Sequence, residues 1–236
     1  MLVTIMILDK IDGFTALTRS GMHVARARYV DSAEDAIAFA ARRDARDERA
    51  VPILLRAIGR GDDGRTAGLL VEKPLTDHNA IRRVYRELMP QVGSAGDRIL
   101  AEASTEHGTD IAIEGRTDAS LGKVVVLRNH AHSVERMVPL DPDGAETLVA
   151  GFQGYHHQPP SEKMRRMLEH LLMRVSAFFE ETGVESFVLD PVRLHENSYT
   201  ILDATLRSHR PLHISKRLAP NAHDRKGYDY RPSGRQ

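Results

Sequence analysis

The 236-residue chain contains no cysteine and no tryptophan. The absence of cysteine excludes disulfides, thiolate metal sites and a cysteine nucleophile. Net charge is also absent, because 33 Lys and Arg residues balance 33 Asp and Glu residues, so no global field attracts nucleic acid or a membrane surface. No apolar run approaches the roughly 20 residues of a membrane span. The apolar stretch 1–8 lacks the basic region of a signal peptide, so we predict a buried strand there and a cytoplasmic protein.

Hydrophobic spacing predicts helices and strands in a mixed order. The predicted helices cover residues 13–20, 32–46, 77–91 and 161–183. The predicted strands cover residues 51–58, 67–72, 98–103, 109–116, 123–127, 185–194 and 199–206. Residues 128–160 are expected to be irregular. This order departs from the regular alternation of a doubly wound parallel sheet, so we predict an α+β protein with a boundary near residues 92–97.

A glycine-rich loop at 59–66 follows the predicted strand 51–58 and carries three glycines and two arginines. Backbone N–H groups in such a loop can approach phosphate oxygens, and guanidinium groups such as those of Arg56 and Arg65 can bind them in pairs. A solvated hairpin turn explains the same residues. The loop alone therefore does not identify a nucleotide site.

Two aspartates interrupt the last two apolar strands. Asp190 precedes Pro191, and Asp203 follows Ile201 and Leu202. A carboxylate among apolar residues is costly unless it is paired or bound to a cation, and converging carboxylates suit Mg²⁺. A turn aspartate before a proline and a strand-end aspartate that caps a neighbour explain the residues equally well.

Histidines and the basic C-terminal segment are weaker signals. His130 and His132 have the spacing of a metal pair on a strand, but no third ligand is near them in the sequence, so we interpret them as solvent-exposed. The segment from Arg207 to Arg235 is basic and contains Tyr228 and Tyr230. Such a segment can bind RNA or an acidic partner. We favour a solvated tail.

Several segments together resemble the ATP-grasp β subunit of ADP-forming acyl-CoA synthetases, the group of the acetyl-CoA and succinyl-CoA synthetases. Residues 99–113 match the hinge strand and the "GVELIVG" strand without a gap, and 121–126 resemble "FGPVV". Residues 188–191 and 201–204 resemble "ELNP" and "VDAR". Shorter likenesses lie at 16–24, 32–36, 51–56 and 138–141. The resemblance extends from about residue 16 to residue 207.

The resemblance implies an ATP-grasp fold, with two α+β lobes and a nucleotide bound between them. It divides the chain into a leading strand and helix at 1–24 that pack on the C-terminal lobe, an N-terminal lobe at 25–97, a C-terminal lobe at 98–207 and a basic tail at 208–236. The implied cofactors are ATP and Mg²⁺.

The resemblance also implies residue roles. Glu102 and Ala103 would face the adenine edge, and Asp110 would stand near the ribose or the phosphates. Asp190 and Asp203 would be the Mg²⁺ ligands, with Asp190 in place of the family's asparagine.

Departures from the family pattern concern the phosphate end of the site. Arg56 replaces the family's strand lysine, and Arg65 stands in its "HK" loop pair, so these two arginines are the candidate catalytic residues. Val188 replaces the glutamate before "LNP", and residues 128–132 replace the glycine-rich "GLGG" segment.

The predicted function is ATP-dependent activation of a carboxylate through an acyl phosphate or an acyl-CoA, by a stand-alone ligase or by a β subunit. The alternative is a catalytically degenerate ATP-grasp domain that acts as a nucleotide-binding or regulatory subunit. The expected partners are a small-molecule carboxylate, a CoA-binding subunit and a second copy of this chain, without a membrane or nucleic acid.

Overall fold

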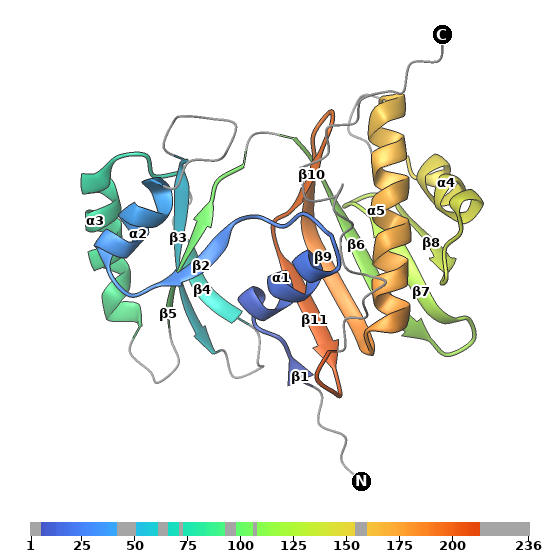
Figure 1. Ribbon diagram of the computed structural model, residues 1–236, viewed down its shortest axis with the longest axis horizontal. Helices are drawn as coiled ribbons and strands as arrows, with labels where there is room; N and C mark the ends of the chain where they lie inside the picture. Colours follow the sequence, from blue (N-terminus) through green and yellow to red (C-terminus); the bar gives the residue numbers. More distant parts are fainter. Residues whose placement is uncertain are drawn as a thin grey trace. The chain divides into compact units, whose positions relative to one another are not determined.

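A computed structural model describes residues 6–41, 51–60, 66–70, 73–92, 98–105, 108–153 and 160–212 (Figure 1). The chain forms two compact units, each built on an antiparallel sheet with helices against it. Unit 1 combines Met1–Val24 with His107–Gln236, and unit 2 is Ala25–Glu106. The α+β class is confirmed. The chain divides after Glu106 rather than after residue 97, because the strand at 98–103 pairs within unit 2.

The described residues of unit 2 form a sheet of four strands, two α-helices and one short 3₁₀ helix. Its strands are β2 (Ala27–Val30), β3 (Ile53–Arg60), β4 (Thr66–Leu70) and β5 (Arg98–Ala103), in the order β2-β5-β3-β4. Its helices are α2 (Ala33–Ala41), α3 (His78–Leu88) and the short 3₁₀ turn η1 (Met89–Gln91). Asp77 caps α3 by accepting a hydrogen bond from the N–H of Ala80 at 2.8 Å. The apolar stripe of α3, namely Ile81, Val84, Tyr85 and Leu88, is buried as its spacing predicts.

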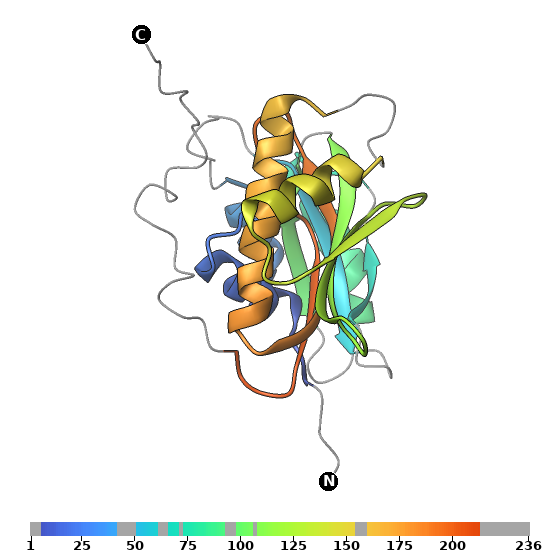
Figure 2. The ribbon, with the colours of Figure 1, turned by 90° about the vertical axis from the view of Figure 1, so that its right-hand side faces the viewer.

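Unit 1 contains the larger sheet. Its strands are β1 (Met6–Ile7), β6 (Thr109–Asp118), β7 (Gly122–Arg128), β8 (Ser133–Met137), β9 (Val184–Leu194), β10 (Tyr199–Ile201) and β11 (Ala204–Ser208). The strand order is β1-β11-β9-β6-β7-β8, and β10 also pairs with β9. The helices are α1 (Lys10–Arg19), α4 (Pro142–Gly151) and α5 (Glu162–Glu181). Figure 2 shows α5 and α4 on the same side of this sheet.

The helix side of the larger sheet is the core of unit 1. Phe179 of α5 packs edge-on against Phe187 of β9, with ring centroids 5.2 Å apart. Gly115 of β6 lies beneath Phe187 so closely that an added Cβ would stand 2.0 Å from the ring. Lys123 donates to the carbonyl of Phe179 at 2.6 Å, and burial lowers the pKa of its ammonium, with Glu180 opposing that effect. A cation near the last carbonyls of a helix is favourable.

The opposite side of the same sheet carries charged residues. Side chains alternate along a strand, and cross-strand partners share a face. Glu114 is opposite Val126 on β7 and Val188 on β9, while Val126 is opposite Glu135 on β8. We define the charged face as the side of this sheet that bears Glu114, Arg116, Arg128, Glu135 and Asp190.

Three expectations about the elements are wrong. Residues 128–160 are not irregular throughout, since β8 and α4 lie within them. The strand 199–206 is two strands, β10 and β11, separated by Leu202 and Asp203. The start of the chain is not buried where it is described, because Met6 and Ile7 are 40% and 36% exposed. The helix predicted at 32–46 is described only to residue 41, and most of the loop 59–66 lies outside the described residues. Among the described helices, none is both long and apolar enough to span a membrane.

Candidate functional site

Asp190 and Asp203 lie directly opposite each other in unit 1. The β9–β11 ladder pairs Leu189 with Ala204, and the N–H of Asp190 donates to the carbonyl of Asp203 at 3.2 Å, which continues the register by one position. Opposite residues of an antiparallel pair project from the same face of the sheet. The two carboxyl side chains are 44% and 36% exposed. The sequence therefore brings two accessible carboxylates to one place.

Arg128 reaches the first of these carboxylates from the end of β7. Its Nη2 donates to Asp190 Oδ2 at 3.2 Å, while its Nε donates to Glu114 Oε1. The guanidinium thus connects three strands, β6, β7 and β9. The cation lies where two anionic side chains would otherwise repel each other, and it holds Asp190 in a defined position.

Lys10 lies beside the second carboxylate, that of Asp203. Its ammonium nitrogen lies 3.6 Å from Asp203 Oδ1 and 5.2 Å from the centre of the Phe14 ring, and the side chain is 6% exposed. The N–H of Ala204 also donates to Asp203 Oδ1 at 2.8 Å. A buried ammonium is stable only beside such anionic or aromatic neighbours.

The donor set of Asp190 and Asp203 fits Mg²⁺. This cation prefers oxygen ligands and is commonly held by one or two carboxylates, with the remaining positions left to water and substrate phosphates. In the described part of the chain, no group of three or more His, Cys, Asp or Glu side chains is placed to hold a metal. A two-carboxylate site that needs phosphate oxygens to complete it agrees with both observations.

Asp110, the candidate ribose residue, is already paired. Arg193 is directly opposite it on β9, and the guanidinium binds its carboxylate through two hydrogen bonds, each 2.8 Å long. The hydrogen bonds that Arg193 donates to Asp110 raise the pKa of the guanidinium, against the effect of burial. Any hydroxyl bound by Asp110 would have to share the carboxylate with Arg193.

Arg56, Glu102 and Ala103 lie together in the sheet of unit 2. Arg56 Nη2 is 3.6 Å from Glu102 Oε2, and the Glu102 side chain is 7% exposed. The N–H of Ala103 donates to the carbonyl of Arg26 at 2.8 Å, so it is used within the unit. The structure therefore brings the predicted phosphate residue Arg56 beside the predicted adenine residue Glu102. Arg65 lies outside the described residues.

His130 and His132 are exposed, as expected, in the turn between β7 and β8. The side chain of Asn129 accepts hydrogen bonds from the N–H groups of Ala131 and His132 at 2.9 and 2.8 Å and so shapes this turn. The two histidines therefore lie in a turn and not on a strand, so the spacing of a pair on one side of a strand does not apply to them.

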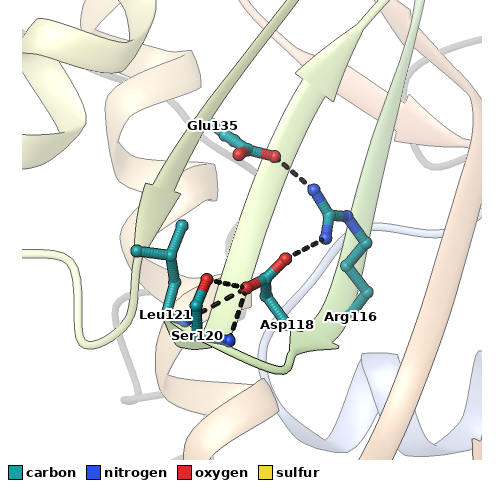
Figure 3. A network of polar contacts seen from close by, with 5 residues as sticks. All are labelled: Arg116, Asp118, Ser120, Leu121 and Glu135. Atoms are coloured by element: carbon teal, nitrogen blue, oxygen red, sulfur yellow. Dashed lines mark hydrogen bonds and ion pairs between the residues drawn. The ribbon is translucent and has the colours of Figure 1, made fainter.

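A second arginine on the charged face also connects two carboxylates (Figure 3). Arg116 lies 3.2 Å from Asp118 Oδ2 and 2.5 Å from Glu135 Oε2. Asp118 accepts further hydrogen bonds from the hydroxyl and N–H of Ser120, at 2.7 and 2.8 Å, and from the N–H of Leu121 at 3.1 Å. These bonds, the side chain of Ser120 first, hold the pKa of Asp118 well below its usual range.

The sequence pattern of the ATP-grasp domain matches residues 5–207, most of the chain. The chain belongs to the ATP-grasp family. No functionally curated protein matches its sequence. The paired aspartates and Arg128 therefore lie within an ATP-grasp domain, and the predicted family is confirmed.

Solved structures share the fold of this ATP-grasp domain at low sequence identity. One is the dinucleotide forming acetyl-coenzyme A synthetase 1 of Ca. Korarchaeum cryptofilum, in complex with coenzyme A and acetyl-coenzyme A and with a phosphorylated phosphohistidine segment. It is 17% identical in sequence, with a TM-score of 0.69, and the match covers 89% of this chain and 94% of that chain. The same synthetase with coenzyme A and Mg-AMPPCP gives 18% identity and a TM-score of 0.63 over 85% and 92% of the two chains. PH1788 of Pyrococcus horikoshii gives 12% and 0.67 over 89% and 92%.

The sequence did not predict four residues that pair with the candidate site residues of this ATP-grasp domain, namely Lys10, Glu114, Arg128 and Arg193. In the sequence, Arg128 stands out only as a departure from the family's glycine-rich segment, because its partners depend on the register of β6, β7 and β9. Arg193 could have been found from the strand pairing of 109–116 with 185–194, had the register been known. Lys10 gives no signal, since a lysine beside Asp9 and Asp12 is typical of a solvated helix start.

Proposed function

We propose that this ATP-grasp domain binds a magnesium nucleotide and uses ATP to activate a small-molecule carboxylate. The observation that supports it is the opposed pair Asp190 and Asp203, each with a cation beside it, in a domain of this family. Nucleotide and divalent metal are bound in similar folds, since the acetyl-coenzyme A synthetase of Ca. Korarchaeum cryptofilum was solved with Mg-AMPPCP.

The chain's own residues would act by position and charge. Asp190 and Asp203 would hold Mg²⁺, which neutralises phosphate charge when bound. Arg128 and Lys10 already offset the negative charge of the two carboxylates. A substrate carboxylate oxygen would form a bond to the γ-phosphorus while the bond to ADP breaks, which gives an acyl phosphate and ADP. An acyl-CoA would follow if a CoA-binding partner subunit supplies the thiol, with phosphate as the leaving group.

A second candidate function is nucleotide binding without catalysis. The pairing of Arg56 with the buried Glu102 favours it, because a guanidinium held at 3.6 Å by a carboxylate of the same sheet is less available to phosphate. An arginine also lacks the compact ammonium of the family's strand lysine. The domain would then report nucleotide levels to a partner subunit.

Nucleotide-dependent stabilisation tests the proposal. A ligand that binds only the folded state raises the free energy of unfolding by mass action, by about 2.7 kcal/mol when its concentration is 100 times Kd, and so raises the melting temperature. We expect Mg-ATP and Mg-ADP to raise the melting temperature of the wild type, and not that of the double variant D190A/D203A. The matched control D143A/E146A removes two exposed carboxylates of α4 and should respond like the wild type. An unchanged wild-type melting curve with both nucleotides would exclude the nucleotide site.

Product release separates the two candidates. With Mg-ATP bound, we expect a panel of short-chain carboxylates to include one that triggers ADP release, measured by a coupled assay, and D190A/D203A to abolish that release. Hydroxylamine should trap the acyl phosphate as a hydroxamate. Binding of Mg-ATP without ADP release for any carboxylate, with or without coenzyme A, would favour the binding function over the ligase.

A further inference from the structure

Arg128 occupies an unusual position for a side chain beside a metal-type carboxylate. It donates to Asp190 Oδ2 at 3.2 Å and to Glu114 from a different nitrogen of the same guanidinium. The side chains of Arg128, Glu114 and Asp190 are 35%, 25% and 44% exposed, so a ligand in solution can reach all three. The guanidinium thus takes one of the oxygens that a divalent cation would bind.

A guanidinium and a metal ion compete for that carboxylate oxygen, but both can bind the phosphates of one nucleotide at the same time. A metal ion that binds alone must displace Arg128 from Asp190, and it provides no new anionic partner for the guanidinium. A metal that arrives with a polyphosphate brings an anion that the guanidinium binds at least as well, because arginine binds phosphate oxygens bidentately. The hydrogen bond to Glu114 on the neighbouring strand uses a different nitrogen, so it would be kept if the guanidinium left Asp190.

Lys10, the cation beside the other carboxylate, is built differently. Its ammonium is 3.6 Å from Asp203, the side chain is 6% exposed, and the Phe14 ring lies 5.2 Å away. A buried ammonium held against an aromatic ring is poorly placed to follow a ligand. Of these two cations, only Arg128 is placed to change partner.

We propose that Arg128 is a phosphate-binding residue that neutralises Asp190 in the nucleotide-free protein and transfers to the nucleotide phosphates when metal and nucleotide bind, with Glu114 as its positioning residue. This inference rests on the proposed nucleotide site. It makes the two ligands cooperative: the metal alone binds weakly, and metal and nucleotide each strengthen the binding of the other by the same factor.

The test compares two affinities that should move in opposite directions. The first is the affinity for Mn²⁺ alone, measured by electron paramagnetic resonance of the free ion. The second is the affinity for Mg-ADP, measured by isothermal titration calorimetry. In R128Q we expect Mn²⁺ alone to bind several-fold more tightly, because Asp190 loses its internal cation, and Mg-ADP to bind about tenfold more weakly, because a charge-assisted phosphate contact is lost. A purely structural role would weaken both.

R116Q is the matched control, because Arg116 lies on the same face and also connects two carboxylates. We expect both of its affinities to stay within about twofold of the wild type, the scatter of an exposed ion pair. In E114Q, Arg128 is left to Asp190 alone, so Mn²⁺ alone should bind more weakly than to the wild type. If circular dichroism shows that R128Q is unfolded, R128K replaces it, and we expect weaker Mg-ADP binding because lysine lacks the fork.

The outcomes separate the two proposals. If the wild type binds Mg-ADP, and R128Q or R128K binds it as tightly, the role of Arg128 is overturned while the nucleotide site stands. The same holds if R128Q weakens Mn²⁺ and Mg-ADP binding together. If the wild type itself binds no Mg-ADP, the proposed function fails and the inference fails with it.

Discussion

Two arginines on the charged face of one sheet each connect two carboxylates, yet the surroundings of the two bridges differ. Arg116 joins Asp118, two residues away in the sequence, to Glu135 on β8. Arg128 joins Glu114 to Asp190, which is 62 residues away and comes from β9. The first bridge connects β6 to β8 across β7, with partners at most 19 residues apart in sequence, and the second connects β7 to β9, with partners 62 residues apart.

The carboxylates also differ in how fully they are used. Asp118 accepts hydrogen bonds from the hydroxyl and the N–H of Ser120, from the N–H of Leu121 and from Arg116, so both of its carboxylate oxygens already have donors in or beside this turn. Gly122 completes the turn with a φ of 78°. Asp190 is 44% exposed and faces Asp203 across the ladder. An arginine between two carboxylates therefore accompanies a structural turn in one place and a candidate ligand site in the other. The difference lies in how many hydrogen bonds the aspartate already accepts from its neighbours.

The largest expected effect comes from disturbing the strand that both bridges share. Gly115 lies between Glu114 and Arg116, and an added Cβ would stand 2.0 Å from the Phe187 ring. We expect G115A to destabilise the protein by about 2 kcal/mol, because overpacking a core forces side chains off their rotamers. Urea unfolding followed by circular dichroism measures the free energy.

G151A is the matched control for this prediction. Gly151 ends α4, and its added Cβ would meet only an ordinary contact, 3.6 Å from a methyl group of Val134. We expect G151A to be neutral or slightly stabilising, since alanine limits the unfolded chain. A G115A protein as stable as G151A would show that the sheet can shift away from Phe187 at little cost in stability.

The elements that the sequence predicted well are those whose burial pattern is complete. β5, with the apolar run Ile99, Leu100 and Ala101, matches its predicted bounds, and the broad apolar face of α5 predicts that helix. β8 was missed because it is a sheet edge with mostly exposed side chains, so neither an apolar run nor a clean alternation marks it. α4 did carry a signal, the Asp141 cap followed by Pro142 in the first turn.

The candidate site divides in the same way. The positions of Asp190 and Asp203 were predicted from strand-end carboxylates and a family resemblance, because those depend on local sequence. Their cations were not, since Arg128 meets Asp190 only through the pairing of β7 with β6 and of β6 with β9. Registers of strands distant in sequence are fixed by packing of the whole sheet, and no local pattern records them.

A double-mutant cycle sharpens the comparison with an effect of intermediate size. Without nucleotide, we expect Arg128–Glu114 and Arg116–Glu135 each to show a coupling energy of about 0.5 kcal/mol, the range of exposed ion pairs. With saturating Mg-ADP, the Arg128–Glu114 coupling should change and the Arg116–Glu135 coupling should not, because only Arg128 acquires a new partner. Urea unfolding of the wild type, R128Q, E114Q, R128Q/E114Q and the equivalent Arg116 set gives both values. Couplings that respond alike to Mg-ADP would remove the distinction between the two bridges.

The smallest expected effect concerns the turn of the first bridge. D118N should lower the melting temperature slightly, because the amide oxygen still accepts hydrogen bonds from Ser120 and Leu121 but the side chain loses the charge that pairs with Arg116.

The depressed pKa of Asp118 sets the pH dependence of this effect. A carboxyl whose folded pKa lies below its unfolded value of about 3.9 gives its full stabilisation above that value and loses it as pH falls toward the folded pKa. The difference between wild type and D118N should therefore be constant from about pH 8 to pH 5 and shrink below about pH 4. Scanning calorimetry across this range measures it, with D143N on the exposed surface of α4 as the reference for removing a carboxylate. A difference that grows as the solution becomes acidic would mean that Asp118 is strained rather than stabilised in the turn, and the contrast with Asp190 would lose its physical basis.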